Sequence, residues 1–366
     1  MIERFELPHP RGSTPHLYGE GAIAAGVAEL GPRLAGGSLF VVSARPILDL
    51  HASALEPLRD AAGSCEVIEV ADGEAAKSVV EAERLWRRLS RGGGRRDSIV
   101  AAFGGGSVCD LAGFCAGTFL RGVPWIAMPS TLLAQVDAAI GGKTAIDLAE
   151  AKNAVGLFHH PHAVLAEPGL LSTLPDVERR SGLVEAIKVG AVVDRELFAL
   201  LERSIERLLA GDVRALAAVA AAAARAKARL VGADPEEAGA RQLLNFGHTL
   251  GHALEAEVGY GRIAHGDAVA HGMRFALALS RAAGLTATGA ERLQALLDRL
   301  GVPGLPALDA ARLVTRISRD KKARAEGVGW VLMTGLGEGR FGVLRPPEEV
   351  AERLEEFLLA RGDPPV

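Results

Sequence analysis

The hydrophobic positions in the first half of the chain form short runs that are rich in β-branched residues and alternate with stretches of helical periodicity. Short apolar runs separated by amphipathic helices are typical of βαβ units, which assemble into a parallel sheet. The pattern therefore predicts an α/β domain that ends near residue 175. Its expected strands are SLFVVS at 38–43, CEVIEV at 65–70, SIVAAF at 98–103, PWIAMP at 124–129 and AVLAE at 163–167.

From about residue 176 the pattern becomes helical, with long segments that are rich in Ala, Leu and Arg. A β-like segment, VGWVLMTG at 328–335, interrupts this series, and no internal repeat is visible. The length and the change of pattern together predict two domains, 1–175 and 176–366. The expected helices are 177–208, 212–231, 245–257, 267–284, 288–300 and 347–361.

Composition narrows the function classes. The net charge of −4 argues against non-specific binding of nucleic acid. The longest apolar run, 215–224, is mostly alanine and about half as long as a membrane span, so we expect no membrane insertion. The N-terminus shows no signal-peptide hydrophobic region. The few cysteines lack CxxC spacing, which favours a reducing compartment, the cytoplasm; they are Cys65, Cys109 and Cys115.

The strongest chemical signal is the segment RQLLNFGHTLGHALEAEVGYGRIAHGD at 241–267. If 245–255 is helical, four polar side chains share one face, because their spacing follows the helical period. They are Arg241, Asn245, His248 and His252. His265 follows in a glycine-rich turn. Two imidazoles one helical turn apart are a common metal-ligand geometry, so the segment predicts a divalent-metal site.

A further ligand lies upstream, in SGLVEAIKVGAVVD. Glu185 and Lys188 share one face of a predicted helix whose other positions are apolar. A solvated Glu–Lys pair is the common meaning of this spacing, but these surroundings are too apolar for a solvated face. A carboxylate with two imidazoles leaves one coordination position open, as in catalytic zinc sites.

A nucleotide signal lies in the first half. The strand predicted at 98–103 runs into GGGSVCDLAGFCAG, which places a glycine triplet between a strand and a helix. Such glycines let backbone N–H groups approach a pyrophosphate at a helix N-terminus, although an ordinary tight turn also fits. Asp110 in the helix, and Glu74 and Lys77 on another predicted strand–helix turn, favour the nucleotide.

Cations at motif positions of this acidic chain predict a small anionic substrate. Lys143 follows a glycine pair but lacks the spacing of a P-loop. Together with Asp137, Lys152 and Asn153 it indicates a polar loop that reaches a ligand. The other cations are Arg121, Lys188, Lys227, Arg241, Lys321 and Lys322.

In order and spacing, several motifs resemble the 3-dehydroquinate synthases: GGGSVCDLAGFCAGTFLRG, PSTLLAQVDAAIGGKTAID, AKNAVGLF, LVEAIKVG, NFGHTLGHALE and HGDAV, over about residues 70–340. The resemblance implies a homodimer. Each subunit would have a Rossmann-like α/β NAD-binding domain, a mainly α-helical metal- and substrate-binding domain, and a site in the cleft between them. The implied reaction converts 3-deoxy-D-arabino-heptulosonate 7-phosphate into 3-dehydroquinate and phosphate, with NAD and zinc or cobalt.

The resemblance also implies roles for single residues. The metal ligands would be Glu185, His248 and His265, whereas His252 would lie near the substrate phosphate and the proton transfers. The substrate phosphate would also meet Lys143, Asn153, Asn245, one of Lys321 and Lys322, and Arg121 from the other subunit. The substrate carboxylate would be held by Lys227 and Arg241, and the ring hydroxyls by Asp137, Lys188 and Glu237. The cofactor positions would be Glu74, Lys77, Gly105, Gly106, Asp110, Ser130, Thr131, Lys152 and Thr173.

The sequence departs from the family pattern at Arg45, where an acidic residue usually meets the adenosine ribose; an arginine could instead meet the 2′-phosphate of NADP.

Three alternatives to the dehydroquinate synthase function stay open. Another sugar phosphate cyclase should alter the pair Lys227 and Arg241. A metal-dependent polyol dehydrogenase would release NADH and need fewer cations. A non-catalytic nucleotide sensor would have no reason to keep two histidines and Glu185 together.

Overall fold

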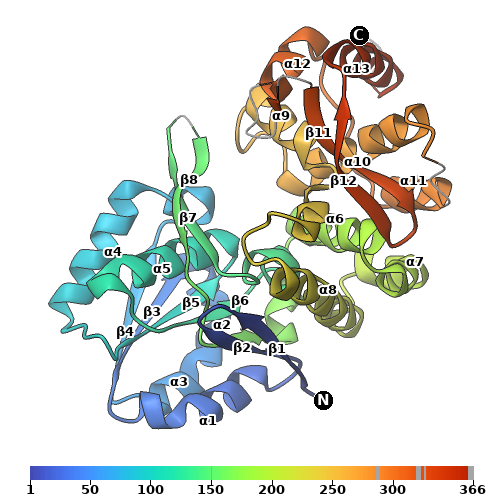
Figure 1. Cartoon of the computed structure of the whole chain (residues 1–366). Coiled ribbons are helices and arrows are strands. Elements are labelled where there is room, and N and C mark those ends of the chain that lie inside the picture. Colours follow the sequence, from blue (N-terminus) through green and yellow to red (C-terminus); the bar gives the residue numbers. More distant parts are fainter. Residues whose placement is uncertain (150, 286–288, 319–322, 325–326, 362–366) are drawn as a thin grey trace. The chain divides into compact units, whose positions relative to one another are not determined.

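The computed structural model describes residues 1–149, 151–285, 289–318, 323–324 and 327–361. By its internal contacts the chain divides into two compact units, which are treated separately below (Figure 1). The first unit comprises Met1–Pro175 and Gly211–Pro235, and the second comprises Asp176–Ala210 and Glu236–Val366.

The first unit is built on a seven-stranded sheet in the order β1-β2-β9-β6-β5-β3-β4. All neighbours run parallel except β1 and β2, which form an antiparallel hairpin at one edge. The five predicted strands are confirmed to within one or two residues, and the hairpin was not predicted. The strands are β1 (Glu3–His9), β2 (Gly12–Tyr18), β3 (Ser38–Ala44), β4 (Ser64–Val70), β5 (Ile99–Gly104), β6 (Trp125–Pro129) and β9 (Val164–Ala166).

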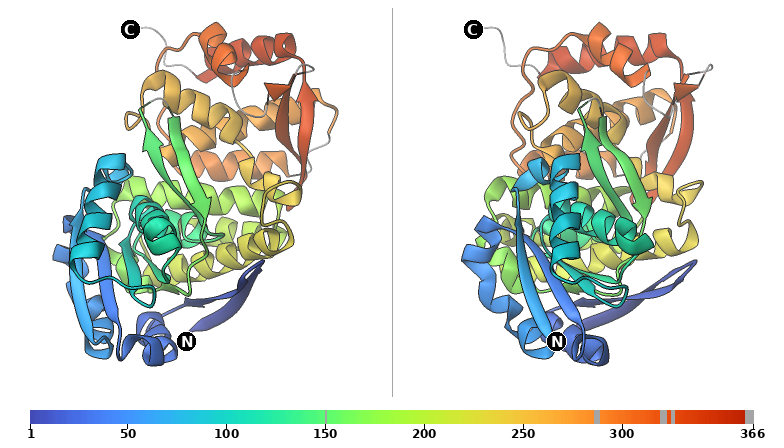
Figure 2. Two further views of the ribbon diagram at one scale, coloured as in Figure 1. Left: turned by 60° about the vertical axis from the view of Figure 1, so that its left-hand side comes forward. Right: turned by 90° about the vertical axis from the view of Figure 1, so that its left-hand side faces the viewer.

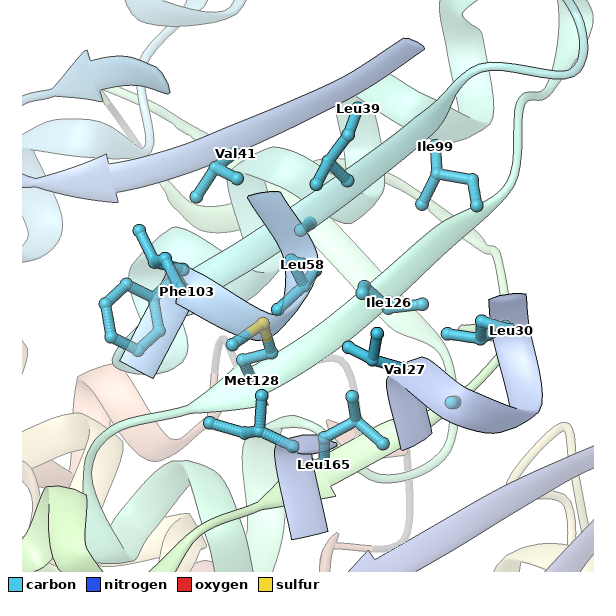
Figure 3. Packing of buried hydrophobic residues seen from close by; sticks show 14 of the residues in the cluster. Val27, Leu30, Leu39, Val41, Leu58, Ile99, Phe103, Ile126, Met128 and Leu165 are labelled. Carbon is cyan, nitrogen blue, oxygen red and sulfur yellow. The ribbon is translucent and has the colours of Figure 1, made fainter. Parts of the chain in front are cut away.

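The central strands are apolar on both faces because helices cover the sheet. Figure 3 shows one such layer, in which Leu39, Ile99 and Ile126 of three strands pack against Val27 of one helix and Leu58 of another. The helices of this part are α1 (Ala22–Leu34), α2 (Arg45–His51), η1 (Ala52–Leu55), α3 (Glu56–Ala61), η2 (Gly73–Ala76), α4 (Val79–Arg91), α5 (Gly106–Thr118), η3 (Phe119–Arg121), η4 (Ala134–Ala138) and η5 (Pro168–Thr173).

The segment expected to be a polar loop is instead a β-hairpin of β7 (Lys143–Leu148) and β8 (Ala151–Phe158). β7 packs on α5, and the far end of the hairpin extends beyond the helices of the first unit (Figures 1 and 2). Lys143 pairs with Phe158 in the ladder, whereas Lys152 and Asn153 lie at an irregularity in the pairing, where Asn153 has a positive φ of 52°.

The unit boundaries differ from the expected single division after residue 175. The helix α8 (Val213–Ala233) belongs to the first unit, because it packs against η4, η5 and the edge strand β1. Its buried face is largely alanine, so its backbone can approach these elements closely, as expected for the apolar run at 215–224. The change from strand-rich to helical pattern along the sequence could not show that this later helix packs against elements of the first unit.

The second unit is mainly helical, with a small antiparallel sheet in the order β10-β11-β12. The helix expected at 177–208 is two helices, because Asp194 breaks it and caps the second through Glu196 N and Leu197 N. The strand predicted at 328–335 is confirmed, whereas α12 and β12 were not predicted. The elements are α6 (Asp176–Val192), α7 (Arg195–Leu209), η6 (Ala240–Asn245), α9 (His248–Val258), α10 (His265–Ala282), α11 (Ala290–Arg299), α12 (Ala310–Ser318), β10 (Ala323–Arg324), β11 (Gly327–Gly335), β12 (Glu338–Arg345) and α13 (Pro347–Arg361). Within the described part of the chain, each helix is too short or too polar to cross a membrane.

Candidate metal centre and nucleotide edge

Three helices of the second unit bring a carboxylate and two imidazoles together. Glu185 lies on α6, while His248 and His265 are the first residues of α9 and α10. One ligand atom from each lies within 4.8 Å of the others, and Glu185 Oε1 is 3.7 Å from His248 Nε2 and 3.6 Å from His265 Nε2. Glu185 Oε1 is buried and has no hydrogen-bond partner among the described residues. This donor set fits a divalent cation with an open coordination position.

Glycines allow these helices to approach so closely. A Cβ atom on Gly266 of α10 would lie 2.3 Å from the Cα of Ser181 on α6. A Cβ atom on Gly272 of α10 would lie 1.8 Å from the carbonyl oxygen of Gly247, directly before α9. Real Cβ atoms essentially never show such contacts, so only glycine fits at both positions. Gly266 of HGDAV and Gly272, three residues beyond that motif, thus let α10 approach α6 and the start of α9.

The charges in this cluster balance one another. Burial alone would raise the pKa of Glu185, but Lys188 Nζ contacts its Oε2 and, with His265, lowers that pKa to about 2. Burial alone would lower the pKa of His265, but the nearby carboxylates of Glu185 and Glu255 raise it to about 10. A cation that binds at His265 Nε2 must therefore displace a proton.

The expected face of four polar residues does not form. The helix α9 begins only at His248, because Gly247 has a left-handed φ of 82° and Phe246 an extended ψ of 122°. Arg241 and Asn245 therefore lie in the preceding 3₁₀ turn η6. His252 is exposed one turn along α9, with its ring 5.2 Å from that of His248, centroid to centroid.

Other expected substrate residues of the second unit lie around η6. Arg241 is buried, with 2% of its surface exposed. Asn245 donates a hydrogen bond from Nδ2 to Oε1 of Glu237 at 2.6 Å, and Glu237 has a positive φ of 61°. Lys321 and Lys322 lie outside the described residues.

The predicted nucleotide residues gather at the carboxyl edge of the sheet in the first unit. The strand order reverses between β3 and β5, and parallel sheets bind ligands at such switch points. The glycine triplet joins β5 to α5: Gly104 ends the strand, Gly105 links the two elements and Gly106 begins the helix. Thr131, another expected cofactor residue, lies next to this turn, because a Cβ atom on Gly105 would lie only 3.1 Å from its Cγ2. Ser130 has a buried hydroxyl with no hydrogen-bond partner among the described residues, which fits a hydroxyl that binds a ligand.

Lys77 connects most of the other expected cofactor residues. Its buried ammonium lies 2.9 Å from Asp110 Oδ2 and 3.6 Å from Glu74 Oε1, and it also contacts Asn153 Oδ1. Lys152 Nζ approaches the same Glu74 oxygen at 3.6 Å. Burial raises the pKa of Asp110 to about 6, because Lys77 only partly offsets the desolvation.

The sequence patterns did not predict a role for Asp147, whose Oδ1 lies 3.7 Å from Lys77 Nζ and accepts from the backbone N–H of Asn153 at 2.6 Å. The acidic residue in TAID was the available signal. Thr173, also expected at the cofactor, is exposed on η5. Its hydroxyl oxygen lies 2.7 Å from His51 Nε2.

Lys227 and Asp137 form a close pair in the first unit. Lys227 Nζ donates to Asp137 Oδ1 at 2.6 Å and to the Asp137 carbonyl oxygen at 2.7 Å, which connects α8 to η4. Lys143 is exposed at the start of β7. Arg121 is exposed, and as the last residue of η3 it has a positive φ of 66°.

Comparison with known proteins gives a consistent family match. The models "3-dehydroquinate synthase N-terminal" and "3-dehydroquinate synthase C-terminal" match residues 67–181 and 182–323. A 3-dehydroquinate synthase from Pelobacter propionicus is 41% identical over 305 residues, which are 82% of this chain and 85% of that protein.

Solved structures agree at the level of the fold. A 2-epi-5-epi-valiolone synthase from Streptomyces hygroscopicus subsp. jinggangensis, with NAD+ and Zn2+ bound, is 26% identical, with a TM-score of 0.82 over 91% of this chain and 94% of that one. A 2-deoxy-scyllo-inosose synthase complexed with carbaglucose-6-phosphate, NAD+ and Co2+ has a TM-score of 0.87 at 23% identity, over 97% of this chain and 100% of that one.

Proposed function

The chain belongs to the 3-dehydroquinate synthase family, and we propose that it converts 3-deoxy-D-arabino-heptulosonate 7-phosphate into 3-dehydroquinate and phosphate, a step of the shikimate pathway to aromatic amino acids. It is thus an enzyme that acts on a sugar phosphate, and we place it among the phosphate-eliminating carbon–oxygen lyases. The convergence of Glu185, His248 and His265 within this family match carries the proposal.

The proposed reaction is redox-neutral overall. A ring alcohol is oxidised, phosphate leaves by β-elimination, the ketone is reduced again, the ring opens, and an intramolecular aldol addition closes the carbocycle. A bound zinc or cobalt ion would supply Lewis-acid chemistry and a bound NAD the hydride acceptor. Glu185, His248 and His265 would hold the metal.

NAD would occupy the carboxyl edge of the first unit's sheet. The glycine turn before α5 offers backbone N–H groups to the pyrophosphate, and the Ser130 hydroxyl is available to a ligand. The cluster around Lys77 holds the surrounding side chains in place. The proposed cofactor positions are Glu74, Lys77, Gly105, Gly106, Asp110, Ser130, Thr131, Lys152 and Thr173.

The substrate would be held mainly by cations and amides, which suits an enzyme that positions its substrate more than it attacks it. Lys227 and Arg241 would hold the carboxylate. Asp137, Lys188 and Glu237 would hold ring hydroxyls. The phosphate would meet Lys143, Asn153, Asn245, Arg121 and one of Lys321 and Lys322, with His252 close to the proton transfers. The departing phosphate can itself accept the proton, which agrees with the lack of an evident strong base in the predicted set.

A coupled assay tests this proposal. The heptulosonate phosphate is supplied with NAD in catalytic amounts, and phosphate and dehydroquinate are measured together. Equal release of both, with no net NADH, is expected. Accumulation of NADH in proportion to turnover would instead support a polyol dehydrogenase.

We also propose that the protein works in the cytoplasm as a homodimer, with small-molecule ligands and without nucleic-acid or membrane partners. Its three cysteines are free thiols, as expected in a reducing compartment. Light scattering tests the dimer. If Arg121 completes the partner's phosphate site, mixing an Arg121→Ala protein with an inactive His248→Ala protein should restore part of the activity in mixed dimers.

A further inference from the structure

Both histidines of the metal cluster have a protein acceptor at Nδ1. His248 Nδ1 lies 3.3 Å from the carbonyl oxygen of Phe246, and His265 Nδ1 lies 3.3 Å from Oε2 of Glu255. A carbonyl oxygen and an ionised carboxylate only accept hydrogen bonds, so Nδ1 carries the hydrogen in both rings. In a neutral ring the lone pair is then on Nε2, which is the atom that approaches Glu185 in each case.

The two acceptors differ in kind. The Phe246 carbonyl belongs to the turn directly before α9, so the local backbone fixes it. Glu255 is a buried side chain on α9 that reaches the first residue of α10. Its hydrogen bond is charge-assisted and therefore stronger than one to a neutral carbonyl. A carboxylate behind a metal-bound imidazole also increases the basicity of the ligand.

Exposure explains why His265 needs this support more than His248 does. The side chain of His265 is 32% exposed, whereas that of His248 is 12% exposed. The neighbours of His265 therefore leave its ring more room to rotate toward solvent. The Glu255 side chain is only 6% exposed, so the surrounding residues hold its carboxylate in place.

We propose that Glu255 is a positioning residue that holds His265 with Nε2 toward the metal and thereby sets the affinity of the site for the metal. This inference rests on the proposed function only in taking a divalent metal as the occupant. The sequence signal was the acidic residue that ends NFGHTLGHALE, which the helical pattern alone left without a role.

Glu257 provides a matched control. It lies on the same helix, its side chain is 7% exposed, and it pairs with Arg312 and Arg316 on α12. The variants Glu255→Gln, Glu255→Ala and Glu257→Gln are compared with the unaltered protein. The dissociation constants of Zn2+ and Co2+ are measured by competition with a chelator, and the His265 Nδ1–H signal of the Zn2+-bound protein by nitrogen NMR after selective ¹⁵N labelling.

We expect Glu255→Ala to weaken metal binding about tenfold to a hundredfold, which is the usual effect of losing an outer carboxylate. Glu255→Gln should weaken it less, because the amide oxygen still accepts from Nδ1. In the Zn2+-bound alanine variant the His265 Nδ1–H signal should shift and exchange faster with water, because its hydrogen bond is lost, whereas Glu257→Gln should leave both the affinity and this signal unchanged.

Unchanged affinity in Glu255→Ala, or an equal loss in Glu257→Gln, would overturn the proposal. Thermal unfolding of the metal-free variants identifies a loss of fold, in which case the glutamine variant decides. None of these measurements uses turnover. Metal binding that depends on Glu255 in a protein that makes no dehydroquinate would therefore reject the proposed function and leave this inference standing, and the reverse result would reject this inference alone.

Discussion

Gly272 of α10 faces the carbonyl oxygen of Gly247 so closely that a Cβ atom at position 272 would lie 1.8 Å from it. The neighbouring atom is backbone and cannot rotate away, so a side chain must push α10 from the start of α9. We expect Gly272→Ala to lower the free energy of unfolding by more than about 2 kcal/mol. Because the same shift separates His248 from His265, metal affinity should fall as well.

Gly335, also in the second unit, is the control for this substitution. A Cβ atom there would make only an ordinary contact, 3.5 Å from the Glu338 side chain. Gly335→Ala should therefore change the melting temperature little and leave metal binding intact. Thermal unfolding and chelator competition measure both variants, and similar behaviour of the two would show that the close approach of α10 to Gly247 is unimportant.

The second prediction concerns the ligands. His248→Ala should lose the metal and most of the activity while the fold survives, because this side chain is only partly buried. Glu185→Ala should lose the metal and also stability, because it leaves the buried Lys188 ammonium without its carboxylate. A chelator should abolish the activity of the unaltered protein, and added Zn2+ or Co2+ should restore it.

His252→Ala separates the third histidine from the ligands. Its ring is near that of His248, but it is not part of the set whose ligand atoms lie within 4.8 Å of one another. The variant should keep the metal, as measured by elemental analysis, and lose catalytic rate. Loss of metal in this variant, or full metal occupancy in His248→Ala, would contradict the ligand assignment.

The residues of the candidate site could be predicted from the sequence, but the backbone geometry that brings them together could not. The runs that became β3 to β6 carry their own apolar pattern, so their strands and the turns after them could be located. His248 and His252 are close in sequence, and helical spacing alone could not show which of them meets Glu185. That choice depends on Gly247, whose left-handed backbone starts α9 at His248. The return of α8 to the first unit depends on tertiary packing, which no local pattern contains.

The third prediction concerns the nicotinamide cofactor. Arg45 follows β3 at the edge where the strand order reverses, and its guanidinium pairs with Asp49 at 2.8 Å and with Glu69 at 3.8 Å. These two carboxylates outweigh the single positive charge and should repel a 2′-phosphate. We therefore expect tighter binding of NAD than of NADP, measured by fluorescence titration.

The double variant Asp49→Asn, Glu69→Gln tests the cause of that preference. Removing both negative charges leaves Arg45 unopposed, so affinity for NADP should rise severalfold while affinity for NAD stays nearly constant. Preferential NADP binding by the unaltered protein would mean that Arg45 recognises the phosphate despite its two partners.

The last prediction separates the cyclases. If Lys227 and Arg241 hold the substrate carboxylate, Arg241→Lys should impair catalysis although the charge is kept, because a point charge replaces a planar two-pronged donor. A hydrogen bond to a charged group contributes about 1.5–3 kcal/mol, so kcat/KM should fall roughly tenfold to a hundredfold. Sedoheptulose 7-phosphate, which lacks the carboxylate, should be a poor substrate of the unaltered protein. Cyclisation of both sugars at similar rates would remove the carboxylate role and the dehydroquinate assignment together, and it would leave a sugar phosphate cyclase of broader specificity.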